Sequence, residues 1–277
     1  MRVLIVGGSG FLGGELVRRC AAAGHEVGAT CLTRPGEPAQ ATWLRVDVRE
    51  RRDVAAALDA FGPEVTINAA YRQGDWAVTA EGAAHVAAGV ARTGGRLVQV
   101  SSDVVFSGAG KRYDETCPPD PITPYGAAKA AAETAVRAVL PDAAIARTSL
   151  ILGHGRSGHE ALVRSLATGA GEGVLFTDDV RCPVHVRDLA AALVEAGVRG
   201  LSGVLHVAGG DAVSRYELGV LIARRDGLDA ARLRTGRRAG SGIPGPLEVR
   251  LDCSATRQRL RTRLRGAREF LATPDAS

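Results

Sequence analysis

The sequence predicts an α/β protein with a doubly wound, mostly parallel sheet of the Rossmann type and a smaller C-terminal substrate lobe. The chain has 277 residues, which is enough for one large α/β domain with a small lobe. Through its first half, short aliphatic runs alternate with segments of helical periodicity. This alternation is typical of right-handed βαβ units, in which helices cover both faces of a parallel sheet.

Each expected strand is a short apolar run bounded by glycine, proline or polar residues. The expected strands are Arg2–Val6, Glu26–Thr33, Thr42–Val46, Glu64–Asn68, Arg96–Ser101, Ala143–Arg147 and Val204–Val207. Each expected helix carries apolar residues at helical spacing, and the first three end at glycines 24, 62 and 94. The expected helices are Phe11–Ala23, Arg51–Phe61, Trp76–Thr93, Tyr125–Val139, Arg187–Val198 and Ser214–Arg225.

The regular alternation is interrupted by a proline-rich loop over Ser107–Pro124 and loosens beyond Ser149. We therefore expect a dinucleotide-binding domain over residues 1–150. Residues 151–277 are expected to form mainly a substrate-binding lobe, with some elements returning to the main sheet. Ligands of open α/β sheets bind in the crevice at the carboxyl ends of the strands.

Composition narrows the function class. No run reaches 18 apolar residues, and the first apolar run is too short for a signal peptide, so we expect no membrane partner. The five cysteines are odd in number, widely spread and without a CxxC pair. This usage is typical of reduced thiols in a cytoplasmic protein and does not indicate a metal site.

The formal net charge of +5 is uneven, because residues 224–268 hold 13 arginines against four acidic residues. Such a segment can attract nucleic acid or a phosphorylated small molecule. Neither interleaved aromatic residues nor a DNA-binding motif accompanies it, so we expect a solvated arginine-rich surface and no nucleic-acid partner. Of the 35 basic residues only Lys111 and Lys129 are lysine, which marks both as candidates for tasks that arginine cannot perform.

The segment GGSGFLG at positions 7–13 joins the first expected strand to the first expected helix. Glycines at these positions allow a sharp turn, close approach of the backbone to a pyrophosphate and tight helix packing. The helix N-terminus then offers free N–H groups and partial positive charge to the phosphates. The candidate cofactor-binding residues of this turn are Gly7, Gly10, Phe11, Leu12 and Gly13.

The second expected strand ends in Thr33-Arg34, where an acidic residue would select NAD. A guanidinium at Arg34 suits a 2′-phosphate, so we predict NADPH as cofactor, with NADH as the alternative. Further cofactor contacts are expected at the ends of the third and fourth strands. These candidates are Asp47, Val48, Asn68, Ala69 and Ala70.

Tyr125 and Lys129 stand four residues apart, which puts them on one face of a helix. A tyrosine hydroxyl titrates near pH 10, and a nearby ammonium together with a cationic nicotinamide favours the phenolate. We therefore predict a lowered pKa for Tyr125, and both residues as catalytic and cofactor-binding. At the end of the fifth strand, the Ser102 hydroxyl is placed to donate to a carbonyl oxygen as negative charge develops on it.

Together GGSGFLG at 7–13, SSDVVFSG at 101–108 and YGAAK at 125–129 resemble the extended short-chain dehydrogenase/reductase family. The closest resemblance is to its dTDP-4-dehydrorhamnose reductase branch. Further matching segments are NAAY at 68–71, Glu133, Arg147-Thr148-Ser149, RCPVHVRDLA at 181–190 and LDCSATRQRLRTRLRG at 251–266. Thr79 stands near a position where the family usually has asparagine.

The resemblance implies a catalytic serine at Ser102, a proton donor at Tyr125 and its partner at Lys129. It also implies a nicotinamide dinucleotide as cofactor and a nucleotide-linked 4-keto-6-deoxy sugar as substrate. The candidate substrate contacts are Tyr71, Asp103, Val105, Phe106 and Arg181. A metal site at His154 and His159 is less favoured than a solvated or substrate-side loop, since no carboxylate or cysteine cluster joins them.

Two alternatives stay open. One is a sugar-nucleotide epimerase or dehydratase that retains NAD. The other is a cofactor-binding regulatory subunit without catalysis, against which the complete serine, tyrosine and lysine set argues. A homodimer is also left open.

Overall fold

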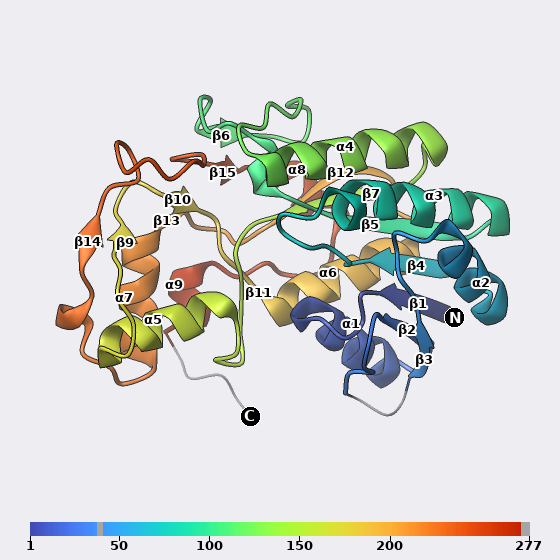
Figure 1. Cartoon of the computed structure of the whole chain (residues 1–277), viewed down its shortest axis with the longest axis horizontal. Helices are drawn as coiled ribbons and strands as arrows, with labels where there is room; N and C mark the ends of the chain where they lie inside the picture. Colours follow the sequence, from blue (N-terminus) through green and yellow to red (C-terminus); the bar gives the residue numbers. More distant parts are fainter. Residues whose placement is uncertain (38–40, 273–277) are drawn as a thin grey trace.

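The computed structural model describes residues 1–37 and 41–272. Its centre is a seven-stranded sheet in the order β12-β7-β5-β4-β1-β2-β3, and every pairing in it is parallel (Figure 1). The strands are β1 (Arg2–Val6), β2 (Glu26–Cys31), β3 (Thr42–Arg45), β4 (Val65–Asn68), β5 (Arg96–Ser102), β7 (Ala144–Thr148) and β12 (Gly203–Val207). Strand order reverses between β1 and β4, as in a doubly wound fold. The predicted fold class is confirmed.

Helices cover both faces of this sheet (Figure 1). One face carries α1 (Phe11–Ala22) and α6 (Val186–Arg199), and the other carries α2 (Arg51–Phe61), α3 (Gly82–Thr93) and α4 (Pro124–Val139). Along β1, Ile5 packs into the core under α1 and α6, whereas Leu4 packs into the core under α2, α3 and α4. A strand buried on both sides needs apolar residues at successive positions, which is why the expected strands read as unbroken aliphatic runs.

Two expected elements differ from the observed bounds by more than one residue at one end. The second strand ends at Cys31 and not at Thr33. The long helix expected from Trp76 begins with a π-helical turn, η1 (Ala77–Glu81), before α3 starts at Gly82. Thr79 in this turn is buried, and its hydroxyl donates to the carbonyl of Arg72 at 2.9 Å. The turn is therefore tied to the loop that follows β4.

After β7 the chain builds a lobe, on the left in Figure 1. Its helices α5 and α7 share a core that includes Leu166, Leu218 and Ile222. Both helices begin with a capping box, in which a serine and a glutamate satisfy each other's backbone N–H groups. The lobe elements are β8 (Ile151–Leu152), α5 (Gly158–Thr168), β9 (Leu175–Phe176), β10 (Val180–Arg181), β11 (Val184–His185), β13 (Val213–Ser214), α7 (Arg215–Arg225), η3 (Ala230–Arg232) and β14 (Thr235–Gly236).

The second half of the chain also contributes to the main sheet. Helix α6 covers one face of it, and β12 is its edge strand beside β7. Near the C-terminus, β15 (Arg250–Leu251) pairs with β6 (Arg112–Tyr113), followed by α8 (Ser254–Arg259) and α9 (Ala267–Phe270). Residues on both sides of position 150 therefore meet at the carboxyl end of the sheet.

The predicted solvated arginine-rich surface is confirmed in large part, because nine of the 13 arginines in residues 224–268 are exposed and the other four are partly buried. The Arg225 side chain is only 5% exposed and pairs with Glu160, while Arg265 pairs with Asp188 on α6. Further pairs are Arg238–Asp179, Arg250–Glu248, Arg263–Glu269 and Arg268–Asp211. Arg225, Arg238, Arg265 and Arg268 thus join the C-terminal segment to the rest of the protein, whereas Arg250 and Arg263 pair with near neighbours in sequence.

The cysteines, the helix lengths and the metal-binding side chains can be compared with what the composition predicts. All five cysteines are free thiols. Within residues 1–37 and 41–272, no helix has both the length and the apolar character that crossing a bilayer requires. In the same ranges, no group of three or more His, Cys, Asp or Glu side chains is arranged to hold a metal ion.

Candidate active site

The glycine turn after β1 is shaped by close packing. Gly7 has φ +83°, and a Cβ there would lie 2.8 Å from the Ala70 nitrogen, so only glycine fits. A Cβ at Gly13 would collide with the Gly7 carbonyl oxygen. Gly10 differs, because among the described residues its Cβ would meet only that same oxygen, at 3.4 Å. Packing within the protein therefore requires glycine at positions 7 and 13. The space over Gly10 is open enough to admit a bound ligand.

Helix α1 begins directly after Gly10, and within the described part of the chain no side chain caps its first turn. Its first N–H groups therefore keep their hydrogen-bonding capacity for an acceptor such as phosphate. Phe11 lies in this first turn and is 36% exposed, while Leu12 is buried. The turn is anchored from β2, since the Gly7 N–H donates to the Thr30 hydroxyl at 2.9 Å. Thr30 is a contact that the sequence analysis missed.

Asn68, at the end of β4, points into the protein. Its amide nitrogen donates to the Gln99 side-chain oxygen at 2.8 Å, and its own oxygen accepts from the Ala70 N–H at 3.1 Å. Asn68 therefore shapes the Ala69-Ala70 turn, which packs against Gly7. Gln99 was also missed, although a polar residue in an otherwise aliphatic strand was a visible signal.

The other predicted cofactor residues lie at the ends of β2 and β3. Arg34 is exposed on the loop after β2. The Asp47 carboxylate accepts from Arg49 Nε at 2.9 Å, and this pairing holds its pKa below the usual value. Val48 is buried, and its carbonyl oxygen lies 3.0 Å from Nδ1 of His85.

Helix α4 starts with a defined cap. The Thr123 hydroxyl accepts from the Gly126 N–H at 3.0 Å, and Pro124 occupies the first turn. A Cβ at Gly126 would collide with the Val104 carbonyl oxygen, which belongs to η2 (Asp103–Val105). Glycine next to Tyr125 therefore lets α4 pack directly against the turn that follows Ser102.

Lys129 is buried, at 3% exposure, and its ammonium donates to the Val100 carbonyl at 3.1 Å. The ammonium also lies 5.3 Å from the ring centroid of Tyr71, which in turn lies 5.9 Å from that of Tyr125. Burial lowers the pKa of Lys129 to about 8, although the Glu133 carboxylate acts in the opposite direction. The Lys129 ammonium therefore loses its proton at a lower pH than an exposed lysine does.

The predicted lowering of the Tyr125 pKa was wrong for the protein by itself. Burial is the main cause that raises the pKa of this hydroxyl. Desolvation disfavours the phenolate, so the side chains of this protein keep Tyr125 in its protonated form.

The structure distinguishes the two serines at the end of β5. Ser101 is buried, and its hydroxyl donates to Glu133 at 2.5 Å. Glu133 is also held by Arg147, with Nη2 at 2.8 Å from the carboxylate. Ser102 is half-buried, and its oxygen accepts from the Val104 N–H at 3.4 Å. Ser102 is thus the less buried of the two serines.

The predicted substrate contacts lie in different environments. Tyr71 is 58% exposed. Val105 and Phe106 are at 0% exposure, and the Phe106 ring stacks on Tyr113 with centroids 4.1 Å apart. The structure therefore places Val105 and Phe106 in the hydrophobic core and not at a surface that a substrate could contact.

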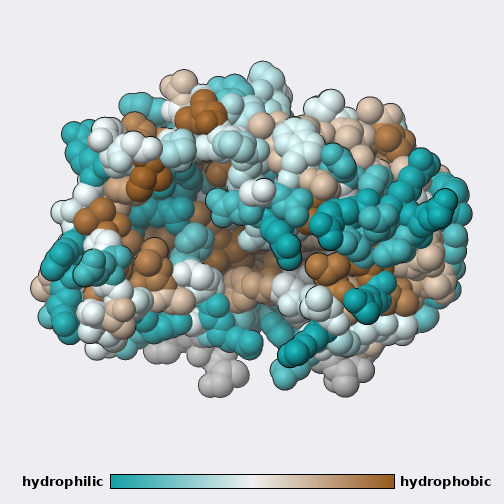
Figure 2. Space-filling view, viewed as in Figure 1, coloured by the Kyte–Doolittle hydropathy of each residue, from teal (hydrophilic) through white to brown (hydrophobic). Residues whose placement is uncertain are grey.

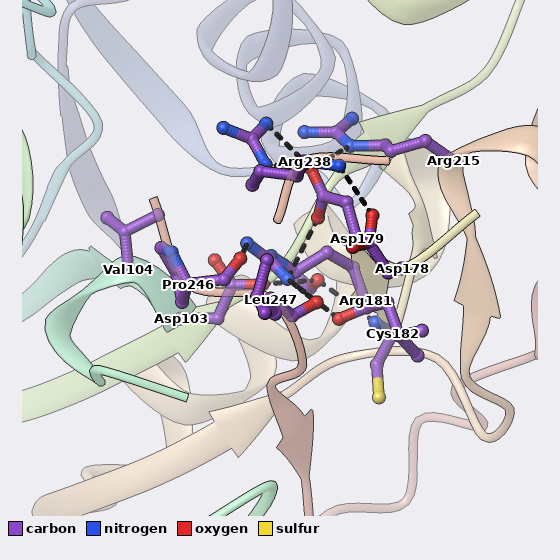
Figure 3. Close-up of polar contacts among 12 residues, drawn as sticks. Asp103, Val104, Asp178, Asp179, Arg181, Cys182, Arg215, Arg238, Pro246 and Leu247 are labelled. Atoms are coloured by element: carbon purple, nitrogen blue, oxygen red, sulfur yellow. Dashed lines mark hydrogen bonds and ion pairs between the residues drawn. The ribbon is translucent and has the colours of Figure 1, made fainter. Parts of the chain in front are cut away.

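Arg181 is also buried, at 4% exposure (Figure 3). Its guanidinium contacts Asp179 at 2.9 Å and donates to the carbonyls of Val180, Leu247 and Pro246. These contacts turn the guanidinium inward, which does not support the predicted contact of Arg181 with the substrate. Its neighbour Asp103 is buried as well, at 2% exposure.

The histidines considered as metal ligands have protein partners. His154 Nε2 lies 3.2 Å from the Glu15 carboxylate, and His159 Nδ1 lies 3.1 Å from the Arg215 guanidinium. Burial lowers the pKa of His159 to about 4. Both histidines therefore contribute to contacts within the protein.

The molecule is hollowed between the lobe and the main sheet, and hydrophobic residues lie recessed there behind hydrophilic ones (Figure 2). Nearly the whole chain is similar to known proteins, since residues 1–273 match the family model described as the RmlD substrate binding domain. The spore coat polysaccharide biosynthesis protein SpsK of Bacillus subtilis is 31% identical over 257 residues, covering 88% of this chain and 87% of that protein. A dTDP-4-dehydrorhamnose reductase of Mycobacterium tuberculosis is 34% identical over 257 residues, covering 88% of this chain and 82% of that protein.

Solved structures show the same fold. The dTDP-4-dehydrorhamnose reductase of Bacillus anthracis, in complex with NADP, has a TM-score of 0.84 at 22% identity and covers 98% of this chain and 96% of its own.

Proposed function

The chain belongs to the RmlD substrate binding domain family, and from this membership we propose that it is an NADPH-dependent reductase. Its proposed substrate is a nucleotide-diphosphate-linked 4-keto-6-deoxy sugar, by similarity to the reductase of Mycobacterium tuberculosis. One observation carries the proposal: α4, with Tyr125 and the buried Lys129, packs against the turn after Ser102. A proton donor, a buried ammonium and a second hydroxyl group are the parts that carbonyl reduction requires.

The glycine turn fits the proposed cofactor. The space over Gly10 and the uncapped first turn of α1, among the described residues, suit a pyrophosphate. We assign Arg34 to the 2′-phosphate, which favours NADPH and leaves NADH as a weaker alternative. When bound, the nicotinamide supplies the hydride that reduces the keto carbon.

In the proposed reaction, Tyr125 donates its proton to the alkoxide oxygen that forms from the keto group. Its raised pKa keeps this proton in place until charge develops on the substrate. Lys129 supplies a nearby positive charge and is assigned to the nicotinamide ribose. Ser102 donates a hydrogen bond to the keto oxygen and orients it.

The remaining expectations are proposed with this function. Residues 1–150 are assigned to the dinucleotide and residues 151–277 mainly to the sugar nucleotide. We propose a cytoplasmic enzyme, in keeping with its free thiols, with no nucleic-acid partner. A homodimer stays a prediction.

The test is NADPH oxidation by the purified protein against a panel of dTDP-, UDP- and GDP-linked keto sugars. We expect oxidation with at least one sugar, and a Tyr125→Phe variant that binds NADPH but loses roughly 10²–10⁴-fold in kcat. An epimerase or dehydratase would retain NAD and consume no NADPH. A regulatory subunit would bind NADPH without turnover. Either result, or full turnover by Tyr125→Phe, rules out the proposal.

A further inference from the structure

A cluster of charged side chains lies between the end of β5 and the lobe (Figure 3), and three of them, Asp103, Asp179 and Arg181, are buried. Asp103 comes from η2, directly after Ser102. Asp179 and Arg181 come from the segment around β10, while Arg215 begins α7 and Arg238 follows β14. Asp179 is at 0% exposure and contacts all three arginines, at 2.9 Å for Arg181, 3.3 Å for Arg215 and 2.8 Å for Arg238. The cluster thus joins the serine end of the sheet to the lobe.

The two carboxylate oxygens of Asp103 have different partners. Oδ2 accepts a hydrogen bond from the Ser149 hydroxyl at 2.6 Å and lies 3.7 Å from Nε of Arg181. Oδ1 lies 3.3 Å from the hydroxyl oxygen of Ser102. The side chain is therefore held from one side by Ser149 and Arg181, and its other oxygen faces the proposed catalytic serine.

We propose that Asp103 is a positioning residue, which holds the Ser102 hydroxyl in the orientation that donates to the keto oxygen of the substrate. This inference rests on the proposed function. Ser102 has one hydroxyl proton, and an ionised Asp103 competes with the substrate for it. A neutral Asp103 donates its own proton to the Ser102 oxygen, so that the Ser102 proton is free for the substrate. No proton leaves either residue in this arrangement.

The net effect of the surroundings of Asp103 is to raise the pKa of its carboxyl above the ordinary value. Burial raises the pKa of this carboxyl, and the charge of Asp179 acts in the same direction. Arg181 and Arg215 act in the opposite direction, but both also contact Asp179. The remaining titratable neighbours are Tyr125 on α4 and Cys182 after β10, and burial raises the pKa of both.

The sign of the pH dependence follows from this arrangement. The competent form is the neutral one, so its contribution to kcat is present below the pKa of Asp103 in the folded protein. It is lost as the pH rises through that value. Because this pKa lies above the ordinary value for aspartate, the loss falls at a higher pH than for an exposed carboxyl.

An asparagine at position 103 distinguishes a role in orienting Ser102 from a purely structural role of Asp103. In Asp103→Asn, the amide nitrogen donates to Ser102 while the amide oxygen accepts from Ser149, which mimics the neutral acid at every pH. Asp103→Ala removes both contacts. Asp120 provides a matched control, because its exposed carboxylate also accepts from a serine, Ser107, whose N–H lies 2.9 Å from it.

The experiment measures kcat and KM against pH, with NADPH affinity from fluorescence, for the wild type, Asp103→Asn, Asp103→Ala and Asp120→Asn. We expect Asp103→Ala to lose roughly 10- to 100-fold in kcat at unchanged NADPH affinity, the usual cost of a misplaced group. Asp103→Asn should keep kcat within about fivefold and lack the alkaline decline of the wild type. Asp120→Asn should match the wild type throughout.

Full kcat in Asp103→Ala overturns the proposal. Equal losses in the Asn and Ala variants, with NADPH binding intact, also overturn it, as does an unchanged alkaline decline in Asp103→Asn. If the wild type reduces no keto sugar, the proposed function fails, and crystal structures decide the positioning role independently. Ser102 should hold one rotamer against Asp103 in the wild type and another in Asp103→Ala, and the same rotamer in both would refute the role.

Discussion

Replacing Gly126 by alanine tests whether close packing of α4 positions the site. The new Cβ would collide with the Val104 carbonyl oxygen and lie 3.0 Å from the Pro121 Cβ. Carbon–oxygen contacts in proteins are rarely shorter than about 3.3 Å, so α4 and η2 must separate by roughly 1 Å. Tyr125 is on one side of this contact and Ser102 on the other. A displacement of about 1 Å between reacting groups costs roughly 100-fold in rate.

The effect on stability should be smaller than the effect on rate. Overpacking costs ~1–3 kcal/mol, and alanine in place of glycine within a helix returns about 1 kcal/mol. The melting temperature should therefore fall by no more than about 6 °C. Gly158→Ala is the matched control, since it also lies in a first helical turn and, among the described residues, meets nothing within 4 Å.

The assay compares kcat/KM for the keto sugar with thermal unfolding of the wild type and both variants. Gly126→Ala should fold, bind NADPH and lose roughly 100-fold in kcat/KM, whereas Gly158→Ala should keep both activity and stability. Wild-type kcat/KM in Gly126→Ala would show that the contact between α4 and η2 does not position the reacting groups.

Three further predictions concern buried charges and the cofactor. Glu133→Gln should lower the free energy of unfolding in urea by about 3–5 kcal/mol, because it leaves the buried Arg147 guanidinium without its partner carboxylate; a loss below about 1 kcal/mol would contradict this. The pKa of Lys129 is about 8 in the folded protein and about 10.4 when unfolded, so the unfolded chain binds more protons in between and wild-type stability should rise from pH 8 to 10. Lys129→Met should lack this rise, and a stability difference between the two proteins that is independent of pH would refute it. Arg34→Ala should weaken NADPH binding by roughly 10- to 100-fold and leave NADH binding unchanged, as measured by fluorescence titration; equal losses for both cofactors would exclude a contact with the 2′-phosphate.

Much of the fold was predictable because its signals are local. The aliphatic runs of β1, β4 and β5 and the glycines after α2 and α3 give the strand and helix bounds to within a few residues. The π-helical turn before α3 was not predictable, since it depends on a hydrogen bond between Thr79 and the loop after β4.

Some parts of the candidate site were also predictable from local sequence, whereas others depend on contacts between distant residues. The glycine turn and the Tyr125–Lys129 spacing depend on neighbours along the chain, and the structure places both as expected beside the carboxyl end of the sheet. The inward orientations of Asn68 and Arg181 depend on Gln99, Asp179 and the loop near Pro246, which are far away in sequence.

The sequence by itself determined the parallel α/β class, the glycine turn after β1 and the helix that carries the tyrosine and lysine, because periodicity and turn chemistry act between adjacent residues. Only the tertiary structure decided which of the two serines is less buried, that Phe106 lies in the core, and that the pKa of Tyr125 is raised. These properties follow from desolvation and from charge pairing, which arise when segments distant in the chain pack against each other.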